Sequence, residues 1–181
     1  MNTFFVSDQH FDHKNIIKYC ERPFSDVDEM NEHMVETHNK MVTNKDIVYH
    51  VGDFCFSPNS RMWLNRLNGK EHHLILGNHD FRHLRQLQEA FDSVQDVKLI
   101  RVQDSDIFLS HYCHLVWPKR HYGTYHLYGH SHGMLQGPTG SLDVGVDPHH
   151  FHPLPWEDVK DVIDNRIAQM QARKEAKKLN I

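Results

Sequence analysis

The stretch His73-Leu74-Ile75-Leu76-Gly77-Asn78-His79-Asp80 decides the fold that we expect for this chain. Its first four residues form a short apolar run that predicts a buried strand, and Gly77 marks the end of that strand. Three polar residues, Asn78, His79 and Asp80, follow at once. Ligand sites of α/β proteins gather where strands end, so this stretch predicts one strand of an α/β sheet that leads directly into a functional site.

The same arrangement, an apolar run that ends in polar ligand-type residues, occurs at four other places in the chain. The runs and the residues that follow them are Phe4–Ser7 with Asp8-Gln9-His10, Asp46–Val51 with Gly52-Asp53, Ile107–Ser110 with His111, and Tyr125–Tyr128 with Gly129-His130-Ser131-His132. Five strand ends of one type predict a single shared site.

Helical spacing of apolar residues separates the early strands. We expect helices over 27–41 (capped by Ser25), around 63–67, over 84–91 and over 156–179, a hairpin of strands 97–102 and 107–110, and a strand over 142–146. The early half therefore alternates strand and helix, and the late half is rich in strands. This order predicts an α/β fold with one added antiparallel section.

The overall composition limits the class of protein. A length of 181 residues suits a single domain, 1–181. No apolar run is long enough to span a membrane and no signal peptide is recognisable, so we expect a cytoplasmic protein without a membrane partner. The three cysteines, Cys20, Cys55 and Cys113, are too scattered for a disulfide framework, and we expect them to be reduced.

The polar residues at the strand ends form a set of candidate metal ligands. In an extended chain residues i and i+2 point the same way, so Asp8 and His10 could hold one cation, and His130 and His132 repeat this spacing. The two oxygens of Asp53 could each reach a different metal. The full set is Asp8, His10, Asp53, Asn78, His111, His130 and His132.

The chemistry of this set indicates the type of metal. Mixed oxygen and nitrogen ligands without sulfur favour Mn, Fe, Zn or Ni over Mg or Ca. Seven protein ligands exceed the number that one tetrahedral zinc takes, whereas two ions bridged by one carboxylate would use them all. The sequence therefore predicts two divalent transition-metal ions.

The order and spacing of these motifs, from Asp8 to His132, resemble those of the calcineurin-like metallophosphoesterases, particularly their compact bacterial and phage members. Leu142–Asp147 resembles the family's last strand, while Gln9 and Cys113 depart from the common pattern without removing a ligand. The resemblance implies a four-layer α/β/β/α sandwich. It also implies one metal held by Asp8, His10, Asp53 and His132 and a second held by Asp53, Asn78, His111 and His130.

The resemblance further implies a mechanism. A hydroxide that bridges the two metals, with Mn the favoured ion, would attack phosphorus. His79 would stabilise charge and act as general acid for the leaving group, oriented by Asp80 or Asp53. The catalytic residues would thus be His79, Asp53 and Asp80.

Two other residues are candidates for contacting the substrate. His13 lies three residues after a ligand and could line the site, although a surface role fits the sequence as well. The guanidinium of Arg22 matches phosphate oxygens, although a packing or capping role before Pro23 is the favoured explanation.

The favoured activity is that of a phosphodiesterase on small phosphodiesters or nucleotides. A phosphomonoesterase would use the same metal set. A nuclease is a third alternative, but the net charge of −4 gives no support for nucleic acid as a partner. A non-catalytic metal-binding module is the alternative from a different class, and it is disfavoured because every ligand and His79 are present. The sequence leaves the natural substrate and the oligomeric state open.

Overall fold

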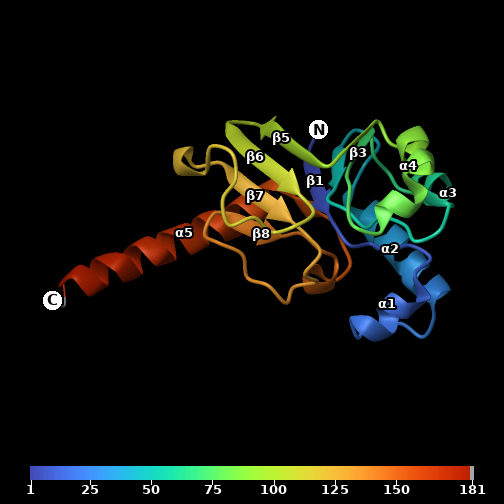
Figure 1. The fold of residues 1–181 in the computed structure, drawn as a ribbon, viewed down its shortest axis with the longest axis horizontal. Coiled ribbons are helices and arrows are strands. Elements are labelled where there is room, and N and C mark those ends of the chain that lie inside the picture. Colours follow the sequence, from blue (N-terminus) through green and yellow to red (C-terminus); the bar gives the residue numbers. More distant parts are fainter. Residues whose placement is uncertain (180–181) are drawn as a thin grey trace.

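Two β-sheets form the centre of the computed structural model, which describes residues 1–179 (Figure 1). The first sheet has the order β4-β3-β2-β1-β9, in which β1 to β4 are parallel and β9 is antiparallel to β1. Its strands are β1 (Thr3–Val6), β2 (Ile47–His50), β3 (Glu71–Ile75), β4 (Ser93–Gln95) and β9 (Leu154–Pro155). Parallel strands carry their carboxyl ends to one edge, which places the ends of β1, β2 and β3 together.

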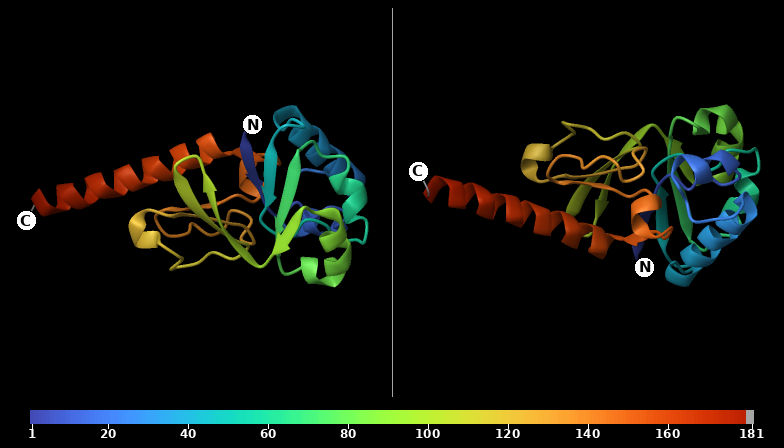
Figure 2. Two further views of the ribbon diagram at one scale, coloured as in Figure 1. Left: turned by 90° about the horizontal axis from the view of Figure 1, so that it is seen from above. Right: turned by 90° about the horizontal axis from the view of Figure 1, so that it is seen from below.

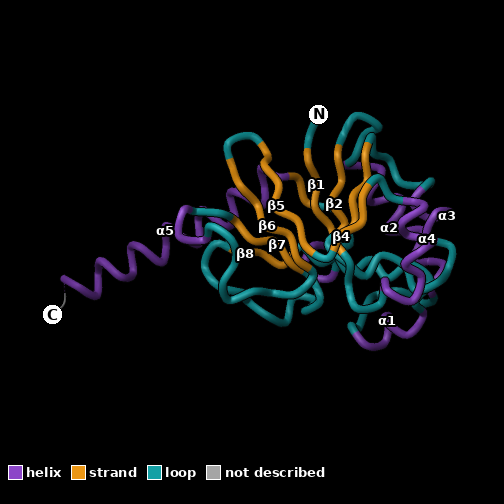
Figure 3. Tube along the Cα trace, turned by 45° about the horizontal axis from the view of Figure 1, so that its top comes forward, coloured by secondary structure: helices purple, strands orange, loops and turns teal. Residues whose placement is uncertain are grey.

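The second sheet has the order β5-β6-β7-β8. Its strands are β5 (Val97–Val102), β6 (Ser105–Ser110), β7 (Tyr125–Tyr128) and β8 (Ser141–Asp143). Only the β5–β6 hairpin is antiparallel, because β6, β7 and β8 pair in parallel. The expected antiparallel section is therefore a mixed sheet, and the loops after β6, β7 and β8 leave it at the same end (Figure 3).

The two sheets are joined where β1 and β8 end. The backbone N–H of Ser7 donates to the carbonyl of Val144 at 2.9 Å, and Ser7 forms a parallel bridge with Gly145. The strand expected over 142–146 thus ends at Asp143 and continues only as this bridge. Because the bridge lies directly beside Asp8, it brings the strand ends of one sheet to those of the other.

The helices flank the sheets. The four N-terminal helices lie together on one side of the first sheet (Figure 2), and they are α1 (Lys14–Tyr19), α2 (Val27–Met41), α3 (Ser60–Leu64) and α4 (Leu84–Ala90). Three short 3₁₀ helices are η1 (Asp80–His83), η2 (Arg120–Tyr122) and η3 (Asp147–His149). The predicted class, an α/β sandwich with two central sheets flanked by helices, is confirmed.

The long C-terminal helix α5 (Trp156–Leu179) begins in the core and ends away from it (Figure 1). Its first turns bury Trp156, Val159 and Ile163 against Phe5 of the first sheet and Leu127 of the second. These side chains belong to one core cluster that both sheets share. Within residues 1–179 no helix is long and apolar enough to cross a membrane.

Helix α2 has the predicted bounds but a different cap. The carboxylate of Asp26, rather than Ser25, accepts a hydrogen bond from the N–H of Glu29 at 2.9 Å. The Glu29 side chain in turn accepts from the N–H of Ser25 at 2.7 Å. These two bonds satisfy N–H groups that a helix start leaves free, and the cap is one residue later than expected. Helix α3 also ends earlier than the predicted Leu67.

Candidate metal centre

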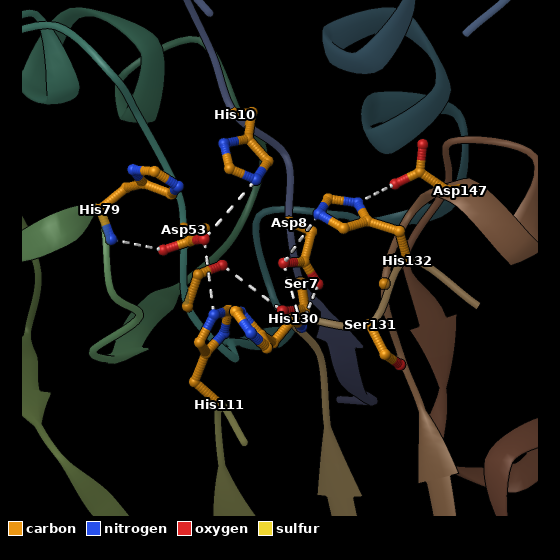
Figure 4. A network of polar contacts seen from close by, with 12 residues as sticks. Ser7, Asp8, His10, Asp53, His79, His111, His130, Ser131, His132 and Asp147 are labelled. Atoms are coloured by element: carbon orange, nitrogen blue, oxygen red, sulfur yellow. Dashed lines mark hydrogen bonds and ion pairs between the residues drawn. The ribbon is translucent and has the colours of Figure 1, made fainter. Parts of the chain in front are cut away.

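The candidate ligands from both sheets converge at one place (Figure 4). Asp8 and His10 follow β1, Asp53 follows β2, and Asn78 and His79 follow β3. The second sheet contributes His111 after β6, and His130 and His132 after β7. The strand ends predicted to share one site therefore do so.

Five of the candidate ligands adopt a left-handed backbone. The φ angles are 57° for Asp8, 53° for His10, 54° for Asp53, 65° for His130 and 48° for His132. The extended backbone that the sequence argument assumed for the pairs Asp8/His10 and His130/His132 is therefore not observed, although Asp8 and His10 still belong to one group of donors. A left-handed non-glycine residue costs about 1–3 kcal/mol and persists only where its surroundings hold it, which is typical of functional sites.

Hydrogen bonds between the strand-end loops hold this backbone in place. The N–H of Asp8 donates to the carbonyl of Gly52 at 3.0 Å, and the N–H of His10 donates to the carbonyl of Asp53 at 2.9 Å. The N–H of His130 donates to both carboxylate oxygens of Asp8, at 3.1 and 2.9 Å. Each loop is thus held by another loop of the same site.

Two motif glycines leave the space that ligand side chains occupy. A Cβ atom on Gly129 would lie 2.0 Å from the hydroxyl of Ser7 and 2.4 Å from Asp8 Oδ2. A Cβ atom on Gly77 would lie 2.2 Å from Asp53 Oδ1. All three distances are far below van der Waals contact, so these positions require glycine for the carboxylates to reach the site.

One group of donors able to hold a cation consists of Asp8, His10 and His132. His132 Nε2 lies 4.0 Å from Asp8 Oδ1, and the rings of His10 and His132 stack at 5.4 Å. The side chain of Asp8 is fully buried. His10 Nε2 is also buried and has no hydrogen-bond partner within residues 1–179.

A second group consists of Asp53, His111 and His130. His111 Nε2 lies 3.4 Å from Asp53 Oδ2 and 3.3 Å from Asn78 Oδ1. Asn78 therefore lies at the position expected of a neutral oxygen ligand. The His130 ring packs against that of His111, with centroids 5.2 Å apart.

Asp53 lies between the two groups (Figure 4). Its Oδ2 atom is 3.6 Å from His10 Nε2 on one side and 3.4 Å from His111 Nε2 on the other. Its Oδ1 atom accepts the N–H of His79 at 2.9 Å, which fixes the rotation of the carboxylate. This geometry suits a carboxylate shared by two cations.

Partners of the far ring nitrogens aim the imidazoles at the centre. The Nδ1–H of His111 donates to the carbonyl of Val51 at 2.8 Å, and the Nδ1–H of His132 donates to Asp147 Oδ2 at 2.7 Å. In the neutral rings this leaves each Nε2 with a lone pair that faces the site. Sequence reasoning missed this role of Asp147; its place after the last strand of the second sheet is the signal that could have found it.

Arg22 holds Asp147 instead of lining the pocket. Its Nε and Nη2 atoms donate to Asp147 at 2.8 and 2.9 Å, and other N–H groups donate to the carbonyls of Asp8 (2.7 Å) and Gln9 (3.1 Å). With only 4% of its surface exposed, Arg22 has no donor directed at a substrate. The geometry corrects the expected phosphate contact to the packing alternative, in which Arg22 supports the ligand loops.

Asp80 also has a structural position. Its buried carboxylate accepts the N–H groups of Asp53 and Gly77 at 2.8 Å and that of Phe54 at 3.1 Å. Within residues 1–179 neither Asp80 nor Asp53 hydrogen-bonds the His79 imidazole, so the expected orientation of that ring by a carboxylate is not observed. Asp80 instead holds the backbone that presents Asp53.

The environment strongly perturbs the carboxylates of the site. Burial raises the pKa of Asp8 to about 6, although the positive charges of His111 and His132 oppose this change. Burial acts to raise the pKa of Asp53 as well, but the hydrogen bond and charge of His111 outweigh it and lower that pKa to about 2. Carboxylates buried among imidazoles are expected where cations bind, because a cation neutralises their charge.

The donor set fits divalent metal ions. The unpartnered, buried Nε2 of His10 faces Asp53, and a buried polar atom without a partner is costly unless a ligand satisfies it. Two groups of nitrogen and oxygen donors lie here, and the Asp53 carboxylate is close to a histidine of each group, His10 in the first and His111 in the second. The predicted ligands are thus brought together. Cys20, which was not predicted to lie near the site, is close to His132 and Asp147.

His79 and His13 line the pocket beside this centre, as does Asn78. The His79 ring lies 5.4 Å from that of His10 and is tilted against that of Phe56 at the same distance. The His13 ring stacks on Phe56 at 3.9 Å. The structure therefore places His13 in the wall of the site, which is one of the two positions that the sequence allows.

Comparison with known proteins supports the fold. No protein-family model matches the chain. Over 81 residues it is 51% identical to an uncharacterized protein of Methanocaldococcus jannaschii, a match that covers 42% of this chain and 46% of that protein. The chain thus matches less than half of the length of this relative.

Two solved structures are similar over most of their length. A protein of unknown function from Aquifex aeolicus has a TM-score of 0.74 and 23% identity, covering 90% of this chain and 99% of that one. A novel archaeal phosphodiesterase has a TM-score of 0.51 and 22% identity, covering 80% and 82%. At this identity the likeness concerns the fold alone, and it agrees with the arrangement of two central sheets flanked by helices.

Proposed function

We propose that this protein is a phosphoesterase that depends on two divalent transition-metal ions, with manganese favoured, and that it hydrolyses small phosphodiesters or nucleotides. The position of Asp53 carries this proposal. Its Oδ2 atom lies 3.6 Å from His10 Nε2 and 3.4 Å from His111 Nε2, between two groups of donors. One carboxylate shared by two nitrogen-rich groups is the arrangement expected of a two-metal site.

The two groups of donors support the division of the ligands that the motif resemblance implies. Asp8, His10, Asp53 and His132 would hold one ion, and Asp53, Asn78, His111 and His130 would hold the other. When bound, two such ions supply an activated water at neutral pH and positive charge for the phosphate oxygens. The remaining polar groups of the pocket are then free to act on the substrate.

His79 is the residue that we assign to proton transfer. It belongs to neither ligand group, and its ring faces the pocket between those of His10 and Phe56. Only its backbone N–H is tied to Asp53. The imidazole is therefore available to donate a proton to the leaving-group oxygen, and histidine is the side chain that most often serves as a general acid.

The experiment that tests this function uses the protein stripped of metal and reconstituted with Mn²⁺. Bis-p-nitrophenyl phosphate and p-nitrophenyl phosphate should be compared as diester and monoester of the same leaving group. We expect turnover of the diester to exceed that of the monoester, to vanish with chelator and to return with Mn²⁺. Faster turnover of the monoester would leave the metal centre intact and reject the diester preference.

The Asp53→Asn variant tests the two-metal assignment directly. Loss of a shared negative ligand should reduce the bound Mn²⁺ per chain and abolish turnover. Asp104→Asn is the matched control, since Asp104 is exposed in the turn before β6, whereas the candidate ligand His111 follows the opposite end of that strand. Activity that survives either complete chelation or Asp53→Asn would show that the proposal is wrong.

A further inference from the structure

The pocket beside the metal centre has two kinds of wall. It encloses about 460 Å³, a volume in the range of small-molecule sites, which is roughly 300–1,000 Å³. One wall consists of the candidate ligands. The other consists mainly of apolar side chains from α1, the loop after β2 and the loop after β7, namely Ile16, Tyr19, Phe56 and Met134. A phosphate needs only the first wall, so the second is suited to a different part of the substrate.

Tyr19 and Met134 are the most exposed members of this apolar wall. Tyr19 is 70% exposed and Met134 is 88% exposed, although both are large apolar side chains. They also line an adjoining hollow together with His132. The pair therefore lines both hollows, and its exposed side chains are accessible to a ligand that extends from the metal centre along the pocket.

The aromatic ring of Tyr19 is available for stacking, whereas that of Phe56 is not. The His13 ring covers Phe56 at 3.9 Å with an interplanar angle of 6°, and the Arg82 guanidinium lies 4.9 Å from the Phe56 centroid. Tyr19 meets His13 only edge-on, at 6.3 Å and 76°. The faces of the Phe56 ring are thus occupied by His13 and Arg82, whereas His13 leaves the faces of the Tyr19 ring uncovered.

We infer that Tyr19 and Met134 form a clamp for the nucleobase of a nucleotide whose phosphate lies at the metal centre. This inference rests on the proposed function, because that function places the phosphate. A base can stack on the tyrosine ring, and the flexible thioether of Met134 packs well against aromatic rings. The exposed amide of Asn15, which also lines the pocket, offers the donor and acceptor that the polar edge of a base requires.

The test compares a nucleotide with two phosphate esters that lack its base. Binding of adenosine 5′-monophosphate, ribose 5-phosphate and phenyl phosphate to the Mn²⁺-loaded protein should be measured by calorimetry. We expect the nucleotide to bind more tightly than ribose 5-phosphate by roughly fivefold or more, the size expected of one base–aromatic stack. Phenyl phosphate should bind less tightly than the nucleotide.

Variants then identify the side chains that cause the preference for the nucleotide over ribose 5-phosphate. Tyr19→Ala should remove the preference for the nucleotide while leaving the affinity for ribose 5-phosphate unchanged, and Tyr19→Phe should retain it. Met134→Ala should weaken it, and Tyr122→Ala, which alters a tyrosine that is 81% exposed on η2, should have no effect. Since Tyr19 is largely exposed, its replacement should leave the fold intact.

The outcomes separate the clamp from the proposed function. Equal affinity for the nucleotide and ribose 5-phosphate, or a preference that survives Tyr19→Ala, would overturn the clamp but leave phosphate binding at the metal centre in place. Phenyl phosphate binding as tightly as the nucleotide would show a site for any aryl group and overturn the assignment to nucleotides. If none of the three ligands binds, the clamp is overturned, whereas the proposed function is decided separately by turnover of the diester with Mn²⁺.

Discussion

The Nδ1 atom of His132 lies 2.7 Å from Oδ2 of Asp147, and this contact sets the direction of the imidazole (Figure 4). Because the carboxylate accepts the Nδ1 proton, the Nε2 atom faces Asp8. Burial acts to lower the pKa of His132, but the hydrogen bond to Asp147 outweighs it and raises that pKa to about 10 in the absence of metal. Asp147 therefore orients the candidate ligand His132 through its far ring nitrogen.

We expect the Asp147→Asn variant to bind Mn²⁺ about 10–100-fold more weakly, because loss of a partner behind a metal-bound histidine typically has an effect of that size. The amide keeps the shape of the side chain but removes the charge that fixes the ring. Titration of the stripped protein with Mn²⁺ measures the change. Asp104→Asn should bind Mn²⁺ as the unaltered protein does, and an unchanged affinity for Asp147→Asn would exclude this role of Asp147.

The Arg22→Ala variant should lose about 3–5 kcal/mol of unfolding free energy, the usual cost of removing one partner of a buried ion pair. The Arg22 side chain is buried against Asp147, and its other N–H groups satisfy the carbonyls of Asp8 and Gln9. Arg22→Lys should recover only part of the loss, since an ammonium group cannot reproduce the two parallel hydrogen bonds that the planar guanidinium donates to Asp147. Urea denaturation gives the values, and a raised KM at unchanged stability would instead indicate a substrate contact.

His79→Ala should reduce kcat by roughly 10²–10⁴-fold for diesters with a poor leaving group, such as dinucleotides, because they need a proton donor. The loss should be much smaller for p-nitrophenyl esters, whose leaving group departs without protonation. Affinity for Mn²⁺ should not change, since His79 belongs to neither ligand group. His121→Ala, at an exposed position, is the matched control, and equal losses for both leaving groups would argue against general acid catalysis.

His38 should make the fold sensitive to acid. Burial lowers its pKa from 6.5 to about 4, and its Nε2–H donates to the carbonyl of Asn68 at 2.8 Å. Below pH 6.5 the unfolded chain therefore gains a proton that the folded chain does not, so the stability present at pH 7 is lost as the pH falls towards 4. For the shift from 6.5 to about 4 the loss amounts to about 3 kcal/mol at the acid end.

The His38→Gln variant measures this contribution. Glutamine can keep a donor near Asn68 but does not titrate, so the fall in unfolding free energy between pH 7 and pH 4.5 should be about 2–3 kcal/mol smaller than in the unaltered protein. Urea denaturation at the two values of pH provides the measurement. The exposed His121→Gln serves as control, and an identical pH dependence in both variants would contradict the assignment to His38.

Much of the fold follows from local sequence patterns. The helices over 27–41 and 156–179 and the strand over 125–128 have the predicted bounds, since regular apolar spacing and clear end signals define them. The short elements β4, β9 and α1 were not predicted. Two to six residues carry too little periodicity, and these elements form because neighbouring strands or core side chains stabilise them.

The candidate ligands could also be recognised from local patterns in the sequence. Each of them lies in the loop that follows an apolar strand, and the order of these loops along the chain matches that of a known metal site. The sequence alone thus determined the fold class, the strand-end position of every candidate ligand and the separation of His79 from them. These properties depend on residues that are adjacent in the chain.

The tertiary structure decided how those residues are held. The left-handed backbone at Asp8 and Asp53 depends on hydrogen bonds between separate loops, and the pairing of Arg22 with Asp147 joins residues 125 positions apart. Tyr19 and Met134 likewise line one pocket only because α1 and the loop after β7 lie beside each other there. Such contacts arise from the packing of distant segments, and no local pattern specifies them.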